Sequence, residues 1–231
     1  MDSAVVVLLD CDNTLLDNDL VQVDLREHLE REFGAESRDR YWAILEELRT
    51  ELGYVDYLGA LQRYRLKPTC DARMLQMSSF LVDYPFAARL YPLALEALRH
   101  LRAWGTTVIL SDGDVVFQPR KIQRSGLWAA VDGRVLITIH KEQALDAVEE
   151  SYPARHYVVV DDKLRLLTAI KQVWRERATT VFVRQGHYAH DPSIAALPAA
   201  DLTVERIGDL LGLDRSVLPA APRGTTSSPG D

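Results

Sequence analysis

The first hydrophobic pattern in the chain is a continuous apolar run, residues 5–9, that ends at two aspartates, Asp10 and Asp12. A valine-rich run without polar alternation predicts a strand that is buried on both faces. Side chains two positions apart in an extended segment point the same way, so we expect both carboxylates to project from the strand's carboxyl end. Two adjacent carboxylates repel each other, and a hard divalent cation between them would offset that repulsion.

Helical periodicity replaces this pattern from Asn18 to about Leu90. Apolar residues recur at helical spacing in successive segments, which predicts a compact bundle of helices with short connections. The segments end at or before Gly34, Gly53, Pro68 and Pro85. Glycine and proline are typical of helix ends, so these positions set the expected boundaries.

From residue 91 onward, strand-length apolar runs alternate with amphipathic helical segments. Further strands are predicted at residues 106–110, 135–139, 157–160, 179–183 and, at an edge, 201–204. This alternation is typical of an α/β fold, a Rossmann-like parallel sheet with helices on both faces. We expect residues 1–17 and 91–212 to form this core domain, with residues 18–90 inserted as a helical cap domain. Residues 213–231, rich in small residues and proline toward their end, predict a disordered tail.

Polar residues follow several of the predicted strands. They are Ser111, Asp112 and Gly113 after the second strand, Lys141 after the third, and Asp161 and Asp162 after the fourth. The carboxyl ends of parallel strands meet at one edge of a sheet, where open α/β sheets bind their ligands. We therefore expect these residues to gather near Asp10 and Asp12.

The segment Asp10-Cys11-Asp12-Asn13-Thr14 resembles the DxDxT signature of the haloacid dehalogenase superfamily of phosphotransferases. Ser111 is similar to the hydroxyl residue of that family's second motif, and Lys141 to the lysine of its third. The pair Asp161-Asp162 resembles the acidic fourth motif. The resemblance extends from Ala4 to about Gly186 in the family's order, and the helical insertion after the first motif resembles the cap of one branch.

The resemblance implies phosphoryl transfer through a covalent aspartyl-phosphate. Asp10 would be the nucleophile, and Asp12 would protonate the leaving oxygen and then activate water. Mg²⁺ would be held by Asp10, by the Asp12 carbonyl and by an acid of the fourth motif. Asp162 aligns with the usual ligand of that motif, and Asp161 would bind the ion directly or through water.

The same resemblance assigns the phosphate contacts. Ser111 would donate a hydrogen bond to the phosphate, and Lys141 would hold the phosphoryl oxygens and the nucleophile. The cradle would be completed by backbone amides around Cys11, Asp12, Asp112 and Gly113. The Cys11 side chain, between the two acids, is expected to point away from them into the core.

Two features depart from the family pattern. Lys141 is followed by Glu142, where the family often has proline, so Lys121 is a rival for the lysine's role. Asp161 takes a position that is commonly glycine, and no further acid occurs in residues 163–169. Both Asp161 and Asp162 therefore stay candidates for the metal.

Other conspicuous residues fit a structural role as well as a functional one. His187 and His190 lack a third ligand at metal spacing, so a loop role is preferred over a metal site. Several arginines could meet an anionic substrate, with solvated helix positions as the alternative. These are Arg63, Arg65, Arg120 and Arg124.

The charge and the amino-acid composition of the chain disfavour some classes of binding partner. A net charge of −7 disfavours a nucleic-acid surface. The first apolar run is too short to span a bilayer, and no export signal precedes it, so no membrane partner is expected. The two cysteines, Cys11 and Cys70, have no metal-ligand spacing and fit a reduced, cytoplasmic setting.

Together these features predict a Mg²⁺-dependent phosphatase acting on a small phosphorylated metabolite. Asp12 disfavours haloacid dehalogenation, which needs no acid to protonate a leaving halide, and phosphonate cleavage, which in this superfamily lacks that acid. A phosphomutase of the same superfamily stays an alternative, as does a non-enzymatic module that senses phosphate or binds proteins. The substrate and the oligomeric state are not specified by the sequence.

Overall fold

A six-stranded parallel sheet is the centre of the part of the chain that the computed structural model describes, residues 3–65 and 73–218. Its strands are β1 (Ser3–Leu9), β2 (Thr106–Asp112), β3 (Val135–Thr138), β4 (Ala154–Asp161), β5 (Ala178–Val183) and β6 (Leu202–Val204). Their order across the sheet is β3-β2-β1-β4-β5-β6. Because β1 pairs with β2 and with β4, its Leu9 lies opposite both Ile109 and Val160. The predicted α/β fold is confirmed, and the first strand is central.

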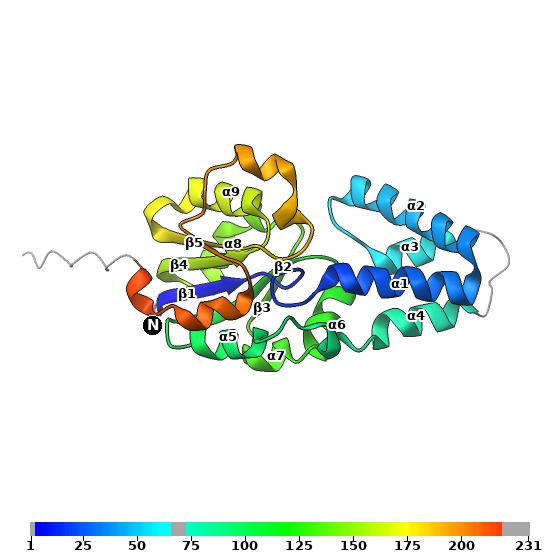
Figure 1. Cartoon of the computed structure of the whole chain (residues 1–231), viewed down its shortest axis with the longest axis horizontal. Helices are drawn as coiled ribbons and strands as arrows, with labels where there is room; N and C mark the ends of the chain where they lie inside the picture. The colour runs from blue at the N-terminus through cyan, green and yellow to red at the C-terminus, as the bar shows by residue number, and fades with distance from the viewer. Residues whose placement is uncertain (1–2, 66–72, 219–231) are drawn as a thin grey trace, which may run out of the picture.

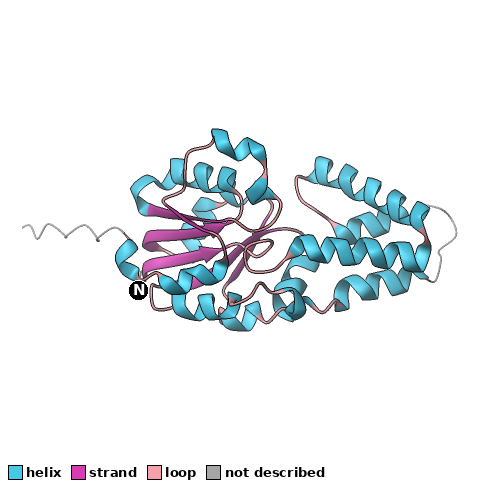
Figure 2. Ribbon diagram, viewed as in Figure 1, coloured by secondary structure: helices cyan, strands magenta, loops and turns pink. Residues whose placement is uncertain are grey.

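Helices cover both faces of this sheet (Figure 2). They are α5 (Ala94–Leu101), α6 (Phe117–Arg124), α7 (Leu127–Ala130), α8 (Leu145–Ser151) and α9 (Leu164–Trp174). Alternate side chains of β1 enter two separate cores: Val7 packs in the one that contains α5 residues, Leu8 in the one that contains α9 residues. This alternation explains the absence of polar residues in the run 5–9, since both faces of the strand are buried.

Short 3₁₀ helices complete the connections. They are η1 (Phe86–Arg89), η2 (Lys141–Gln143), η3 (Arg175–Arg177), η4 (Tyr188–His190), η5 (Pro192–Ala196), η6 (Ile207–Gly212) and η7 (Arg215–Val217). The segment after β3 therefore forms η2, which begins at Lys141, and then α8.

The helices α1 (Asn18–Phe33), α2 (Ala35–Leu52), α3 (Tyr57–Tyr64) and α4 (Arg73–Asp83) lie between β1 and β2 in the chain. We call them the helical insertion. It extends from the end of the sheet at which β1 terminates (Figure 1). Gly34 and Gly53 end its first two helices with φ of 83° and 81°, a left-handed conformation that glycine adopts freely. Pro68 lies outside the described residues.

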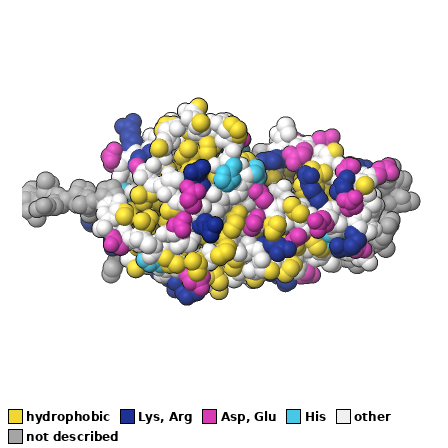
Figure 3. All heavy atoms as spheres, viewed as in Figure 1, with side chains coloured by type: hydrophobic (Ala, Val, Ile, Leu, Met, Phe, Trp, Pro, Cys, Tyr) yellow, Lys and Arg dark blue, Asp and Glu magenta, His cyan; other side chains and the backbone are white. Residues whose placement is uncertain are grey.

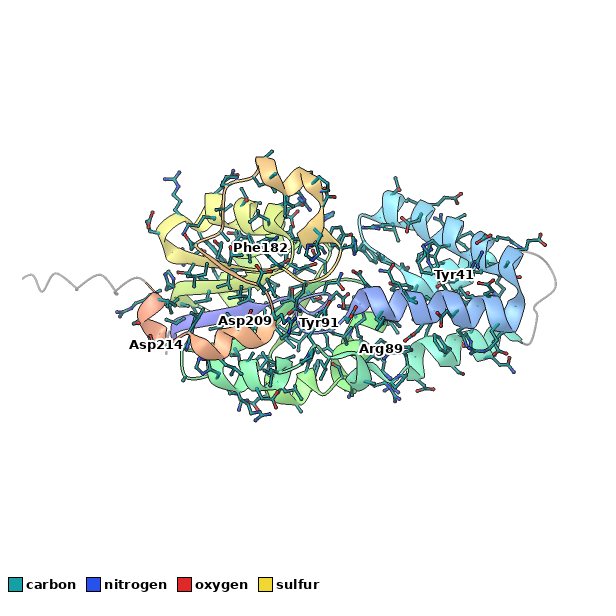
Figure 4. All side chains as sticks on the ribbon, viewed as in Figure 1. Tyr41, Arg89, Tyr91, Phe182, Asp209 and Asp214 are labelled. Carbon is teal, nitrogen blue, oxygen red and sulfur yellow. The ribbon has the colours of Figure 1, made fainter. Side chains whose placement is uncertain are left out.

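The insertion has buried contacts with the rest of the protein. Its own core includes Tyr41, which lies among the helices (Figure 4) and donates its hydroxyl to the Tyr57 carbonyl at 2.7 Å. The Tyr57 ring packs on Phe117 of α6 with ring centres 5.0 Å apart. Arg89, also labelled in Figure 4, donates to Asp24 of α1 at 2.5 Å. One continuous hydrophobic cluster therefore joins the insertion to one face of the sheet.

The C-terminal boundary differs from the prediction. Residues 215–217 form η7, and the Leu213 carbonyl is hydrogen-bonded to the His100 ring at 2.7 Å. Leu218 is buried in the same hydrophobic cluster as residues of α5, so residues 213–218 are part of the folded structure; residues 219–231 lie outside the described part. No helix among the described residues is both long enough and apolar enough to cross a membrane.

Candidate active site

The loop after β1 turns sharply at Asn13. Its backbone has a φ of 61°, and its side-chain oxygen accepts from the amides of Asn18 and Asp19 at 3.0 and 3.1 Å. Asparagine tolerates this left-handed conformation and caps the start of α1 in the same contact. Gly186 packs so closely on Asn13 that an added Cβ would lie 2.4 Å from the Asn13 Cβ. The motif's short turn is therefore held by a segment that follows β5.

Asp10 and Lys141 form a buried ion pair at the end of β1. Lys141 Nζ lies 2.5 Å from Asp10 Oδ1 and 2.9 Å from Asp161 Oδ2, and at most 4 % of any of these side chains is exposed. Burial disfavours the charged lysine, but Asp10 and Asp161 outweigh it, so the pKa of Lys141 is raised. Burial, and next to it the charge of Asp161, raise the pKa of Asp10 to about 6 despite Lys141.

Asp162 completes a cluster of buried carboxylates with Asp10 and Asp161. One oxygen of each lies within 4.8 Å of the others. Both Asp161 oxygens have protein donors, Lys141 Nζ and the Lys163 amide, whereas neither Asp162 oxygen has a partner among the described residues. Burial and the two neighbouring acids raise the pKa of Asp162 well above its usual value. Unpartnered oxygens in a cluster of this kind fit a hard divalent cation, which would supply the missing charge.

Asp12 has a different partner from Asp10. Lys121 Nζ, from α6, lies 2.8 Å from each Asp12 oxygen and 2.9 Å from Asn18 Oδ1. Gln118 Nε2, one turn earlier on α6, donates to Asp12 at 3.3 Å and to Ser111 Oγ at 2.9 Å. Lys121 therefore does not replace Lys141, because each lysine pairs with its own acid. Gln118 was not predicted, although its spacing of three from Lys121 places both on one face of a helix.

The remaining motif residues are placed as follows. Cys11 is fully buried in the core, as expected for a side chain turned away from the acids. Asp112 accepts from the Lys141 amide at 2.8 Å and from Thr138 Oγ1 at 2.7 Å, so its side chain supports the lysine's segment. The Gly113 amide donates to the Thr138 carbonyl at 2.9 Å. The sheet therefore uses this donor in the present conformation, and the phosphate contact expected around Gly113 stays a prediction.

A cavity of about 550 Å³ opens beside the motif residues Asp12, Asp112 and Gly113. Asp12 and Lys121 line it from the sheet side, and Arg49 and Tyr57 from the insertion. Its remaining wall includes Tyr188, whose hydroxyl accepts from Arg49 Nη2. In Figure 3, histidine and basic side chains gather between the sheet and the insertion, where the outline is indented. Such a cavity at the carboxyl ends of parallel strands has the position expected of a substrate site.

The family model for haloacid dehalogenase-like hydrolases matches residues 5–173, which span every motif described above. The chain belongs to this family of hydrolases, and it is an enzyme. A comparison with curated proteins finds no match.

Solved structures of haloacid dehalogenase-like hydrolases agree with this fold. One from Burkholderia xenovorans is 70 % identical over 91 % of this chain and 99 % of its own, with a TM-score of 0.86. One from Xanthomonas campestris is 17 % identical over 94 % and 93 %, with a TM-score of 0.60. A Bacillus subtilis HAD-hydrolase bound to magnesium is 13 % identical over 90 % and 96 %, with a TM-score of 0.59.

Several predicted candidates have structural contacts in this hydrolase. His187 Nδ1 lies 2.6 Å from Asp19 Oδ1, so the ring holds its loop to α1. Neither His187 nor His190 belongs to a cluster of metal-type donors within the described ranges. Three arginines contact protein groups: Arg63 pairs with Glu51, and Arg120 and Arg124 contact the end of α4 and the residue after it. Arg49 and Tyr57, which line the cavity, were not predicted.

Proposed function

We propose that this hydrolase is a Mg²⁺-dependent phosphatase that cleaves a small phosphorylated metabolite through an aspartyl-phosphate at Asp10. The observation that carries the proposal is the second carboxylate, Asp12, held by Lys121 at the cavity wall. A leaving alkoxide needs a proton, whereas a leaving halide does not, so this acid favours phosphate esters over haloacids. In this proposal the helical insertion is the cap and the sheet with its helices is the core.

The chain's own residues supply the two chemical steps. The Asp10 carboxylate attacks phosphorus, the bond to the ester oxygen breaks, and the leaving oxygen takes a proton from Asp12. Asp12 then takes a proton from water, the water oxygen attacks phosphorus, and Asp10 is released with inorganic phosphate. Each step is easier than direct hydrolysis, which is among the slowest uncatalysed reactions.

The neighbouring side chains orient these groups. Ser111 Oγ, fixed by Gln118, donates to the phosphate, and Lys141 holds a phosphoryl oxygen beside Asp10. Lys121 and Gln118 set the orientation of the Asp12 carboxylate.

The metal would be held by Asp10, by the Asp12 carbonyl and by the fourth-motif acids. Asp162 is the better direct ligand, because both of its oxygens are free of protein donors among the described residues, whereas Asp161 accepts from Lys141 and from an amide. When bound, Mg²⁺ would neutralise charge between Asp10 and the phosphoryl oxygens. Cys11, a free and buried thiol, supports the proposed cytoplasmic setting.

The test is phosphate release from p-nitrophenyl phosphate and from a panel of sugar, nucleotide and amino-acid phosphates, with Mg²⁺ and with a chelator. We expect release that requires Mg²⁺ and is lost in Asp10→Asn, with the thermal unfolding of both proteins compared to confirm folding. A folded wild-type protein that is silent across the panel would contradict the proposal.

A further inference from the structure

The Tyr57 hydroxyl is a buried polar group without a partner. Only 3 % of the residue is exposed, and its hydroxyl oxygen forms no hydrogen bond with any described residue. The Asn18 side chain is a polar neighbour that acts to lower the pKa of the phenol, but it forms no hydrogen bond of acceptable geometry with the hydroxyl, and its oxygen accepts from Lys121 Nζ at 2.9 Å. A buried hydroxyl that loses its hydrogen bonds to water destabilises the fold, so an orphaned one in a cavity wall indicates a missing ligand.

The ring of Tyr57 is fixed in place. It packs on Phe117 with ring centres 5.0 Å apart, and its backbone carbonyl accepts from the buried Tyr41 hydroxyl. The side chain therefore presents its hydroxyl at a defined point of the cavity wall. A donor that is already oriented loses little entropy when a ligand binds.

Arg49, in the last turn of α2, lines the same cavity. Among the described residues it pairs with Glu46 on its own helix, at 3.7 Å and about half exposed. It also donates to the Tyr188 hydroxyl. The guanidinium lines the same cavity as Tyr57 and acts to lower the pKa of that phenol, against the larger effects of burial and Asp12. The Arg49 guanidinium, a cation, and the Tyr57 hydroxyl, a neutral donor, thus line the same cavity.

We propose that the Tyr57 hydroxyl and the Arg49 guanidinium form a subsite for a carboxylate on the substrate's leaving group. The inference rests on the proposed phosphatase function and narrows it to phosphate esters of hydroxy acids. A carboxylate offers two planar acceptor oxygens, which match an arginine and a hydroxyl donor together.

The position of the subsite sets where that carboxylate lies in the substrate. Asp12, which protonates the leaving oxygen, lines the same cavity as Tyr57, and Lys121, which holds Asp12, lies over the Phe117 ring on which Tyr57 packs. The carboxylate therefore lies close to the ester oxygen, as in a phosphorylated 2- or 3-hydroxy acid. The phosphoryl group has its own donors, Ser111 and Lys141, so it does not compete for Arg49.

A matched pair of substrates tests the subsite. In 2-phospholactate a carboxylate replaces one methyl group of isopropyl phosphate, so the two esters differ at that group alone. We expect kcat/KM to be about 10- to 100-fold higher for 2-phospholactate, the range of a hydrogen-bonded charge. Arg49→Gln should bring this ratio close to one, and Tyr57→Phe should lower it by about tenfold.

Arg63→Gln is the control, because Arg63 is also on the insertion but pairs with Glu51 at the surface. It should keep the wild-type ratio. Equal turnover of both esters by the wild-type protein would overturn the subsite and leave the phosphatase proposal standing. Turnover of neither ester would count against the phosphatase proposal, and calorimetric binding of the two esters would then test the subsite. Tighter binding of 2-phospholactate that is abolished in Arg49→Gln would support the subsite. Equal binding of the two esters would overturn it.

Discussion

Lys121 Nζ lies 2.8 Å from both carboxylate oxygens of Asp12, although 109 positions separate the two residues in the chain. The ammonium is almost fully buried, with 1 % of the side chain exposed. In the proposed mechanism Asp12 acts in proton transfer, a role that contributes about 10²- to 10⁴-fold. We therefore predict that Lys121→Met lowers kcat by about 10- to 100-fold with a smaller change in KM.

The matched control is Arg124→Met, on the same helix but facing the end of α4. It should leave kcat unchanged. Lys121→Arg should recover part of the loss and shift the pH profile of kcat. A Lys121→Met protein with wild-type kcat would show that Asp12 needs no positioning from α6.

The cluster of Asp10, Asp161 and Asp162 predicts that replacing the Asp162 carboxylate stabilises the metal-free protein. Because burial and the neighbouring acids raise the pKa of Asp162, its charged form destabilises the metal-free fold at neutral pH. Asp162→Asn should therefore raise the free energy of unfolding in the presence of a chelator, by about 1–3 kcal/mol. Urea unfolding at pH 7 measures this change.

The same substitution should remove the stabilisation that Mg²⁺ gives the wild-type protein. Binding to the native state alone raises Tm in proportion to the logarithm of ion concentration, and we expect this dependence to be lost in Asp162→Asn. A variant that is destabilised without metal and still stabilised by Mg²⁺ would exclude Asp162 as a ligand.

The contact between Gly186 and Asn13 predicts that the motif's turn depends on a distant glycine. Gly186→Ala would place a Cβ 2.4 Å from the Asn13 Cβ and would also strain a backbone with φ of 69°. We expect a loss of more than about 1 kcal/mol in unfolding free energy, with turnover reduced as the turn shifts. Gly126→Ala separates the two effects, because Gly126 has a φ of 86° and nothing within 4 Å of the added Cβ.

If clash with Asn13 decides the outcome, Gly186→Ala should be clearly less stable than Gly126→Ala and should lose more activity. Equal losses in unfolding free energy, with turnover retained in both, would contradict this account. Thermal unfolding and phosphate release on the same samples provide the comparison.

The contacts of Asp201 predict how the free energy of unfolding changes with pH. It accepts from the amide and hydroxyl of Thr180 at 2.7 and 2.9 Å and pairs with Lys171 at 2.8 Å. Burial acts to raise the pKa of Asp201, but Lys171 and Thr180 outweigh it, so the folded-state pKa is lowered. The stability from the ionised group is thus complete above the unfolded-state pKa of about 4 and is lost as pH falls through the lowered folded value.

Asp201→Asn should therefore cost about 1 kcal/mol at pH 7, a value that allows for the partly exposed ion pair. The difference from wild type should shrink progressively below about pH 4. Glu205→Gln, which removes only an exposed pair with Arg184, should change the unfolding free energy little. A difference for Asp201→Asn that stays constant to low pH would rule out its charge as the cause.

The sheet could be predicted because its signals are local. The run 5–9 is apolar throughout since both faces of β1 are covered, and the glycines at 34 and 53 end helices through their own backbone preference. The acids that end β1 and β4 could be placed together for the same reason, since parallel strands bring their carboxyl ends to one edge.

Contacts that depend on how the insertion packs could not be predicted. The sequence indicated Lys121 only as a substitute for Lys141, because nothing in the spacing of α6 shows that it reaches Asp12. In the sequence, Arg49 and Tyr57 are indistinguishable from ordinary residues of a helical bundle. Their place in the cavity wall depends on how the insertion packs at the end of the sheet. Nor does the sequence show that β3 extends far enough for the Thr138 carbonyl to accept from the Gly113 amide.

The central claim is that Asp10 carries a phosphoryl group, and the most direct test compares phosphate and halide release by one preparation. The protein is given p-nitrophenyl phosphate or 2-chloropropionate, each with Mg²⁺ and with a chelator, beside Asp10→Asn. We predict inorganic phosphate only with Mg²⁺ and wild-type Asp10, and no chloride under any condition. Chloride release that persists in the chelator, without phosphate release, would contradict the account.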